Sequence, residues 1–180
     1  MRIISGKYRG SSLLGDNIVG TRPTMDRVKE SMFGTIQTYV KNSACLDLFA
    51  GSGSLGLEAI SNGASKVYFV DNNKLVIETI RKNIEKNKIT EETHLLNRDY
   101  SEALKYFKNE NIKFDIIFLD PPYDYLVINK IIKMLKEYDL LNKNGIIVCE
   151  YEKEILNTDS YKLFREKNIA SKKISYYINE

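Results

Sequence analysis

The sequence predicts an α/β fold in which a mostly parallel β-sheet is covered by helices on both faces. From residue 44 onward, short apolar runs alternate with segments whose apolar residues recur at helical spacing, which is the pattern of such a sheet. The tail differs, because the strand-like runs 161–165 and 172–178 are joined by a connection too short for a crossover helix. These two runs therefore predict an antiparallel hairpin at the end of the sheet. The length of 180 residues is typical of one domain.

Each core element follows from a local pattern of apolar residues. The strands are expected at residues 45–49, 67–70, 94–96, 116–119 and 146–149. Four helices are expected between them: one near residues 54–62, one with Val76, Ile80 and Ile84 on one face, one capped by Ser101 and running through Phe107, and one with Ile128, Ile131, Ile132 and Leu135 on one face. The i, i+4 spacing in these segments places the apolar side chains against the sheet.

Residues 1–42 are predicted to form an N-terminal arm, and residues 43–180 the main domain, in one structural unit. The arm contains a possible small hairpin across residues 2–14 and a helix from about residue 24 to 40, with Pro23 just before the helix. One face of this helix is expected to carry Val28, Met32, Ile36 and either Tyr39 or Val40. Residues 1–29 carry six basic and two acidic groups, a net charge of +4, whereas the remaining 151 residues carry a net charge of −1. A cluster of arginines is typical of proteins that bind phosphate groups or nucleic acids. The alternative interpretation of this charge is a basic surface that is simply exposed to solvent.

Composition excludes several other classes of protein. No apolar stretch approaches the roughly 20 residues of a membrane span, and the N-terminus lacks the apolar segment of a signal peptide. We therefore expect a cytoplasmic protein. Cys45 and Cys149 lie in strand-like runs, which favours buried thiols over a disulfide. With His94 as the single histidine, no metal site is expected.

A glycine-rich loop at residues 47–56 lies between a strand and the start of a helix, where free backbone N–H groups can hold a ligand. Its Gly51-x-Gly53-x-x-Gly56 spacing, with Asp71 twenty residues after Gly51, also matches the NAD fingerprint. Asp47 argues against NAD, because a carboxylate there suits an ammonium group better than a pyrophosphate. The sequence therefore favours S-adenosylmethionine.

Acidic residues follow three successive strands, at Asp47, Asp71 and Asp99, where ligands of open α/β sheets bind. Asp71 is expected to accept hydrogen bonds from the ribose hydroxyls and Asp99 from the adenine amine. Acids are common in loops after strands, but three in succession indicate a site. The predicted cofactor-binding residues are Asp47, Phe49, Ala50, Gly51, Ser52, Gly53, Asp71, Asn72, Arg98, Asp99 and Tyr100.

The sequence Asp120-Pro121-Pro122-Tyr123 ends a fourth apolar strand. It resembles the motif IV tetrapeptide of class I methyltransferases that modify exocyclic amines of nucleobases. The amine lone pair is delocalised into the ring, and the Asp120 carboxylate with the Pro121 carbonyl can accept hydrogen bonds from both N–H groups. Tyr123 is expected to stack on the base. The alternative is a strand-terminating turn in which Asp120 caps the next helix.

The whole chain resembles the bacterial 16S rRNA (guanine-N2)-methyltransferase family. The motifs that carry the resemblance are RIISGKYRG at 2–10, TRPT at 21–24, DRVKE at 26–30, LDLFAGSG at 46–53 and DPPY at 120–123. The resemblance implies a class I methyltransferase fold and a monomeric enzyme that uses S-adenosylmethionine. Its implied partner is ribosomal RNA, naked or within an assembled small subunit. The implied RNA contacts are Arg9, Arg22, Arg27 and Lys29.

Two departures from the family pattern are visible. Ser11 and Ser12 stand where the family usually adds a basic residue, and Ala170-Ser171 occupies a turn where glycine is common. Alternative functions are an adenine-N6 methyltransferase acting on DNA or RNA, a protein or small-molecule methyltransferase, and a non-catalytic RNA-binding assembly factor. The chain has no room for the added recognition domain that DNA methyltransferases generally use.

Overall fold

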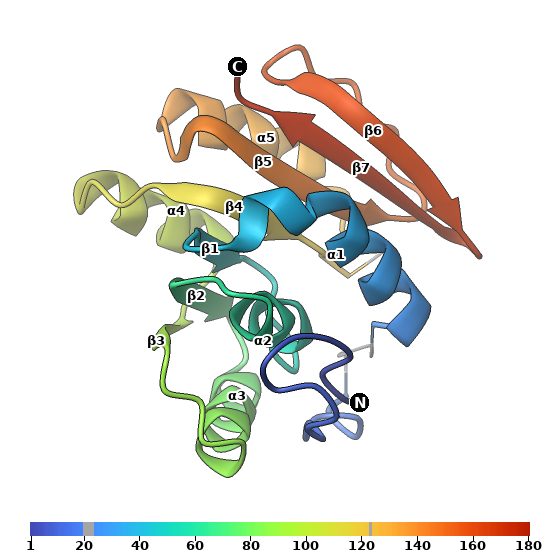
Figure 1. Cartoon of the computed structure of the whole chain (residues 1–180). Coiled ribbons are helices and arrows are strands. Elements are labelled where there is room, and N and C mark those ends of the chain that lie inside the picture. The colour runs from blue at the N-terminus through green and yellow to red at the C-terminus, as the bar shows by residue number, and fades with distance from the viewer. Residues whose placement is uncertain (20–23, 123) are drawn as a thin grey trace.

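A computed structural model describes residues 1–19, 24–122 and 124–180 (Figure 1). Within these residues the strands form a seven-stranded sheet in the order β3-β2-β1-β4-β5-β7-β6. Strands β1 to β5 run parallel to one another, and β7 is antiparallel to both β5 and β6. The mostly parallel sheet with an antiparallel C-terminal hairpin is therefore confirmed.

Most of the strands extend beyond the apolar runs that predicted them, whereas the first, expected at residues 45–49, ends at Asp47. Their bounds are β1 Ala44–Asp47, β2 Lys66–Asp71, β3 Glu92–Asn97, β4 Phe114–Leu119, β5 Leu141–Tyr151, β6 Lys162–Ile169 and β7 Lys172–Ile178. The strand order reverses between β1 and β4, which pair through Leu46 and Ile117. Ligands of open α/β sheets bind at the carboxyl ends of the strands at such a reversal.

Helices cover both faces of the sheet, as predicted. Their bounds are α1 Asp26–Val40, α2 Ser54–Ser61, α3 Lys74–Lys86, α4 Tyr100–Asn109 and α5 Ile128–Glu137. Helices α1, α2 and α3 pack into one apolar cluster with Phe69 and Phe118, and α4 and α5 pack into another with Ile117 and Ile147 (Figure 1). All four predicted apolar residues of α5 are fully buried. No helix among the described residues is long and apolar enough to cross a membrane.

The N-terminal arm packs against α2 and α3 rather than extending away from the domain (Figure 1). Ile3 and Leu13 are buried in the same apolar cluster as α1, α2 and α3. The predicted hairpin is short: Arg2 bridges Ser12, and the N–H groups of Ile3 and Leu13 donate to the carbonyls of Ser11 and Met1, each at 2.9 Å. Asn83 of α3 holds the arm, because its side chain accepts from the Leu14 N–H at 2.7 Å and donates to the Leu14 carbonyl at 3.1 Å.

Three local predictions need correction or refinement. Asp99, not Ser101, caps α4: its carboxylate accepts a hydrogen bond from the Ser101 N–H at 2.8 Å, and a carboxylate is a strong cap. In α1 the last buried apolar residue is Val40. Ala170 takes φ +54° in the turn between β6 and β7, the conformation that glycine adopts without strain.

Both cysteines are buried free thiols. Burial raises the pKa of Cys45 to about 12, so this thiol behaves as a small apolar side chain within the sheet.

Candidate functional site

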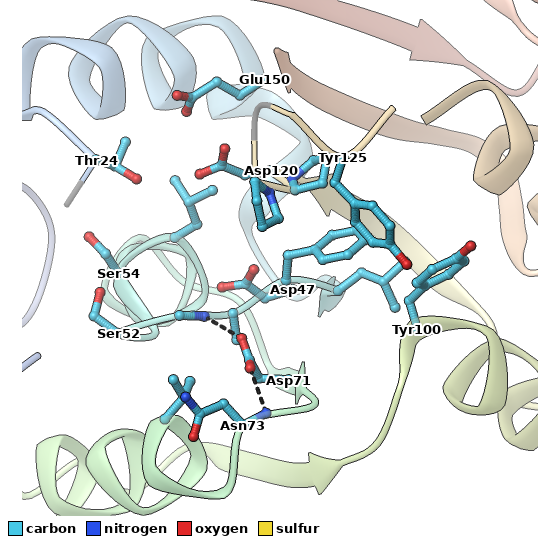
Figure 2. Close-up of a pocket in the computed structure, with 18 of the residues that line it drawn as sticks. Thr24, Asp47, Ser52, Ser54, Asp71, Asn73, Tyr100, Asp120, Tyr125 and Glu150 are labelled. Carbon is cyan, nitrogen blue, oxygen red and sulfur yellow. Dashed lines mark hydrogen bonds between the residues drawn. The ribbon is translucent and has the colours of Figure 1, made fainter. Parts of the chain in front are cut away.

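A cavity of about 660 Å³ lies at the carboxyl ends of the central strands (Figure 2). This volume is within the range typical of cofactor and drug-sized ligand sites. Asp47 at the end of β1, Asp71 at the end of β2 and Asp99 shortly after β3 all line it. The structure therefore brings together the three acids that the sequence placed after successive strands. Of the predicted cofactor-binding residues, all but Gly53 line the cavity.

Asp47 is the most deeply buried of these acids, with 1% of its surface exposed. Its Oδ2 accepts a hydrogen bond from the Gly56 N–H at 3.0 Å, in the first turn of α2. Burial raises the pKa of Asp47 to about 7, and the negative charge of Asp71 adds to this, whereas the Gly56 hydrogen bond opposes it. A cationic group in the cavity would stabilise the ionised form.

Asp71 fixes the shape of the glycine-rich loop. One carboxylate oxygen accepts from the Gly51 N–H at 3.1 Å and the other from the Asn73 N–H at 2.9 Å (Figure 2). Burial raises the pKa of Asp71. Gly53 lies behind the loop at φ +82°, and a Cβ there would come within 3.1 Å of the Ile80 side chain. The left-handed φ and the close Ile80 side chain both favour glycine at this position of the turn.

Aromatic rings surround the end of the cavity at Asp99. The ring of Tyr100 lies 5.8 Å from that of Phe49 and 6.1 Å from that of Tyr125, measured between centroids. Burial alone would raise the pKa of Asp99, but hydrogen bonds from the Ser101 hydroxyl and N–H outweigh it, so the pKa is lowered. An ionised carboxylate beside aromatic walls suits a flat ring that carries an amino group.

Asp120 follows β4 directly, and its carboxylate is directed into the cavity near Asp47 and Glu150 (Figure 2). Pro121 and Pro122 line the same cavity. The motif thus lies beside the three acids, as expected if both act on one reaction. Tyr123, which was predicted to stack on the base, lies outside the described residues.

Comparison with known proteins shows relatives along the whole chain. The family described as Conserved hypothetical protein 95 matches residues 1–178. The ribosomal RNA small subunit methyltransferase D of Haemophilus influenzae is 38% identical over 182 aligned positions, covering 99% of this chain and 94% of the relative. The chain therefore belongs to the family described as Conserved hypothetical protein 95. The putative rRNA methyltransferase YlbH of Bacillus subtilis is 39% identical and covers 86% of this chain and 84% of its own length.

The fold of this family member has close structural counterparts. The putative methyltransferase yhhF from Escherichia coli superposes with a TM-score of 0.85 at 28% identity, covering 100% of this chain and 98% of the counterpart. The predicted family, enzyme class and class I methyltransferase fold are confirmed.

The cavity of this methyltransferase family member fits S-adenosylmethionine. Buried Asp47 provides a negative charge for an ammonium, Asp71 provides acceptors for hydroxyls, and the Asp99 end provides an acceptor beside aromatic rings. The fit rests on the chemistry of these donor and acceptor groups. A pyrophosphate would instead meet the Asp47 carboxylate, so NAD fits poorly.

The four predicted RNA contacts do not share one environment. Arg9 and Arg27 are exposed outside the cavity lining, and Arg22 lies outside the described residues. The prediction for Lys29 is wrong, because this side chain is fully buried. Its Nζ lies 3.4 Å from the Glu58 carboxylate and also donates to the Arg2 carbonyl.

Several cavity residues were missed by sequence reasoning. They come from the start of α1, from the loop after Pro122, and from β5 and β7, and include Thr24, Met25, Val28, Tyr125, Glu150 and Lys172. Glu150 could have been predicted from the sequence, because it follows a buried apolar run as Asp71 and Asp120 do. The others could not, because tertiary packing alone brings them to the cavity.

Proposed function

We propose that this chain methylates the exocyclic N2 amine of a guanine in small-subunit ribosomal RNA, using S-adenosylmethionine. The observation that carries the proposal is the position of Asp120 and Pro121 in the same cavity as Asp47, Asp71 and Asp99. Family membership supports the substrate class, since the Haemophilus influenzae relative is named as a small-subunit ribosomal RNA methyltransferase.

The three acids hold S-adenosylmethionine, which supplies a methyl group on a positively charged sulfur. Asp47 pairs with the ammonium, and its burial makes the pairing strong because little water competes for the charge. Asp71 accepts from the ribose hydroxyls with the lone pairs that its two backbone hydrogen bonds leave. Asp99 accepts from the adenine amine, between the rings of Phe49, Tyr100 and Tyr125.

Asp120 and Pro121 orient the guanine amine. The Asp120 carboxylate accepts from one N–H and the Pro121 carbonyl from the other, so the amine lone pair is turned out of the ring and toward the methyl group. A carboxylate of ordinary basicity is a weak base for this amine, so the proton leaves late in the reaction. Placement of the two reactants makes the largest contribution to the rate.

RNA binding belongs to the N-terminal arm. Arg9 and Arg27 are exposed arginines outside the cavity, where guanidinium groups can reach phosphates. We include Arg22 and Tyr123 as an RNA contact and a stacking platform on sequence grounds alone. The enzyme acts as a monomer on ribosomal RNA, either naked or within the assembled small subunit.

The test of this function offers radiolabelled S-adenosylmethionine with unmethylated small ribosomal subunits, naked ribosomal RNA and duplex DNA. We expect label in ribosomal RNA as N2-methylguanine and a loss of at least about 100-fold in Asp120→Ala. The matched control is Asp124→Ala, an exposed acid four residues later that pairs with Lys153 and does not line the cavity. Label in DNA alone, in adenine, or undiminished in Asp120→Ala would refute the proposal.

A second experiment tests the arm. Arg9→Ala and Arg27→Ala should weaken RNA methylation while stabilisation by S-adenosylhomocysteine against heat is retained. Arg81→Ala, an exposed arginine on α3, is the control and should leave both unchanged. Loss of S-adenosylhomocysteine binding in the arm variants would instead make the arm part of the cofactor site.

A further inference from the structure

Glu150 is a buried acid in the cavity that the proposed reaction has not used. Only 4% of its surface is exposed, and it lines the cavity from the end of β5. Its Oε1 lies 3.1 Å from the Nζ of Lys172 on β7, which also lines the cavity. A buried carboxylate is costly unless its charge is balanced, and Lys172 provides that balance.

The sheet register places Glu150 beside Asp120. Leu119 at the end of β4 pairs with Cys149 of β5, so Asp120, directly after β4, and Glu150 each follow one residue of this pair. Side chains alternate between the faces of a sheet, and Phe118 and Val148 both pack on the α1 face. Asp120 and Glu150 therefore project to that same face, where Figure 2 shows both carboxylates directed into the cavity.

Two neighbouring carboxylates can accept hydrogen bonds from two neighbouring donors on the edge of one nucleobase. Guanine presents its N1–H donor next to the N2 amine, so a base held by Asp120 at the amine presents a second donor toward a neighbouring acceptor. Adenine differs, because the ring nitrogen beside its amine is an acceptor and would meet a carboxylate with repulsion. Enzymes that act on an extruded base read it through hydrogen bonds to this edge.

We propose that Glu150 is a specificity-determining residue whose carboxylate accepts the N1–H of guanine beside the amine that Asp120 holds. This inference rests on the proposed function and names the group that chooses guanine over adenine. A carboxylate offers about four lone-pair positions, and the Oε1 contact with Lys172 is one of the contacts that Glu150 makes. The positive charge of Lys172 lies against the Glu150 carboxylate at the cavity wall.

The test compares guanine with 2-aminopurine, a base that keeps the exocyclic amine but has an acceptor in place of the N1–H. Two unmethylated small-subunit RNAs are prepared by ligation, one with guanine and one with 2-aminopurine at the position that the wild-type enzyme methylates. The mixture is assembled with ribosomal proteins and offered to the enzyme. The two methylated nucleosides are separated after digestion, which gives the ratio of the two kcat/KM values. Because both RNAs compete for the enzyme in one reaction, differences in enzyme concentration and reaction time cancel.

We expect the wild-type enzyme to prefer guanine by roughly 100-fold or more, as sites built around a buried hydrogen bond do. Glu150→Gln should narrow this ratio at least about tenfold, because its amide can donate to the acceptor of 2-aminopurine. The rate on 2-aminopurine should be kept or increased. Glu152→Gln is the control, since Glu152 also pairs with Lys172, at 3.2 Å, but does not line the cavity.

The outcomes separate this inference from the proposed function. A wild-type enzyme that methylates no guanine refutes the proposed function. A wild-type enzyme that methylates guanine, combined with an unchanged ratio in Glu150→Gln, an equal loss on both bases, or an equal change in Glu152→Gln, overturns the role of Glu150 alone. Stabilisation by S-adenosylhomocysteine checks folding. If Glu150→Gln fails that check, Glu150→Asp takes its place, because its shorter side chain withdraws the acceptor and should narrow the ratio in the same direction.

Discussion

Replacing Asp47 by asparagine should stabilise the protein without cofactor and abolish cofactor binding. Burial raises the pKa of Asp47 from 3.8 to about 7, so the folded state holds this proton more tightly than the unfolded state does. The free energy of unfolding therefore falls as pH rises from about 4 to about 7, and the full cost is present above pH 7. Asparagine removes the charge and can still accept the Gly56 N–H.

The size of the effect follows from the pKa difference. Each unit of pKa difference between the folded and unfolded states corresponds to about 1.4 kcal/mol. A difference of about three units therefore lowers the free energy of unfolding by at most about 4 kcal/mol. Half of that value would raise the melting temperature by about 4–8 °C for a chain of this size. We expect the difference between Asp47→Asn and wild type to be large at pH 8 and to shrink toward pH 5.

Differential scanning calorimetry from pH 5 to pH 8, with and without S-adenosylhomocysteine, measures both effects. Wild type should gain stability from the ligand and lose affinity by up to tenfold per pH unit below about pH 7, as Asp47 becomes protonated. The variant should gain nothing from the ligand. A variant less stable than wild type at pH 8, or one that keeps its ligand stabilisation, would refute the reasoning.

Three further substitutions test the packing that supports the site. Lys29→Met leaves the buried Glu58 charge without its ion pair and should cost about 3–5 kcal/mol in urea unfolding; an equal loss in the exposed control Lys82→Met would contradict this. Gly56→Ala places a Cβ 2.2 Å from the buried Phe69 ring and should cost about 1–3 kcal/mol, measured by the same method; an unchanged midpoint would show that the ring moves freely. Asn83→Ala removes the hydrogen bonds that hold the arm backbone, so hydrogen exchange should speed up at residues 13–15 while the sheet stays protected; uniform loss of protection would show that the arm and sheet unfold together.

Most of the fold could be predicted from the sequence because its signals are local. The apolar runs of the central strands and the i, i+4 spacing of Val76 and Ile80 each specify an element without reference to the rest of the chain. The short connection at residues 170–171 was enough to predict the hairpin of β6 and β7. The cap of α4 was misassigned because Asp99 and Ser101 are both good caps, and only the coordinates show which accepts the hydrogen bond.

The site was predictable where its residues follow strands directly. Asp47, Asp71, Asp99 and Asp120 meet because parallel strands end at one edge of the sheet. Lys29 was misread because its charge suggested an exposed role, whereas its burial depends on a partner 29 residues later in α2. The β5–β7 register that brings Lys172 to the cavity is likewise not encoded in any local pattern.

The N-terminal arm cannot attach to the domain until later residues of the chain have been synthesised. Its backbone and side chains depend on Glu58, Asn83 and Glu91, which follow their partners by 54 to 84 residues. At about 5–20 residues per second, the ribosome needs roughly 3–17 s to add those partners. The arm is therefore fixed in place only after α2, α3 and Glu91 have been made. Any factor that shields Ile3 and Leu13 during this interval should raise the yield of folded enzyme.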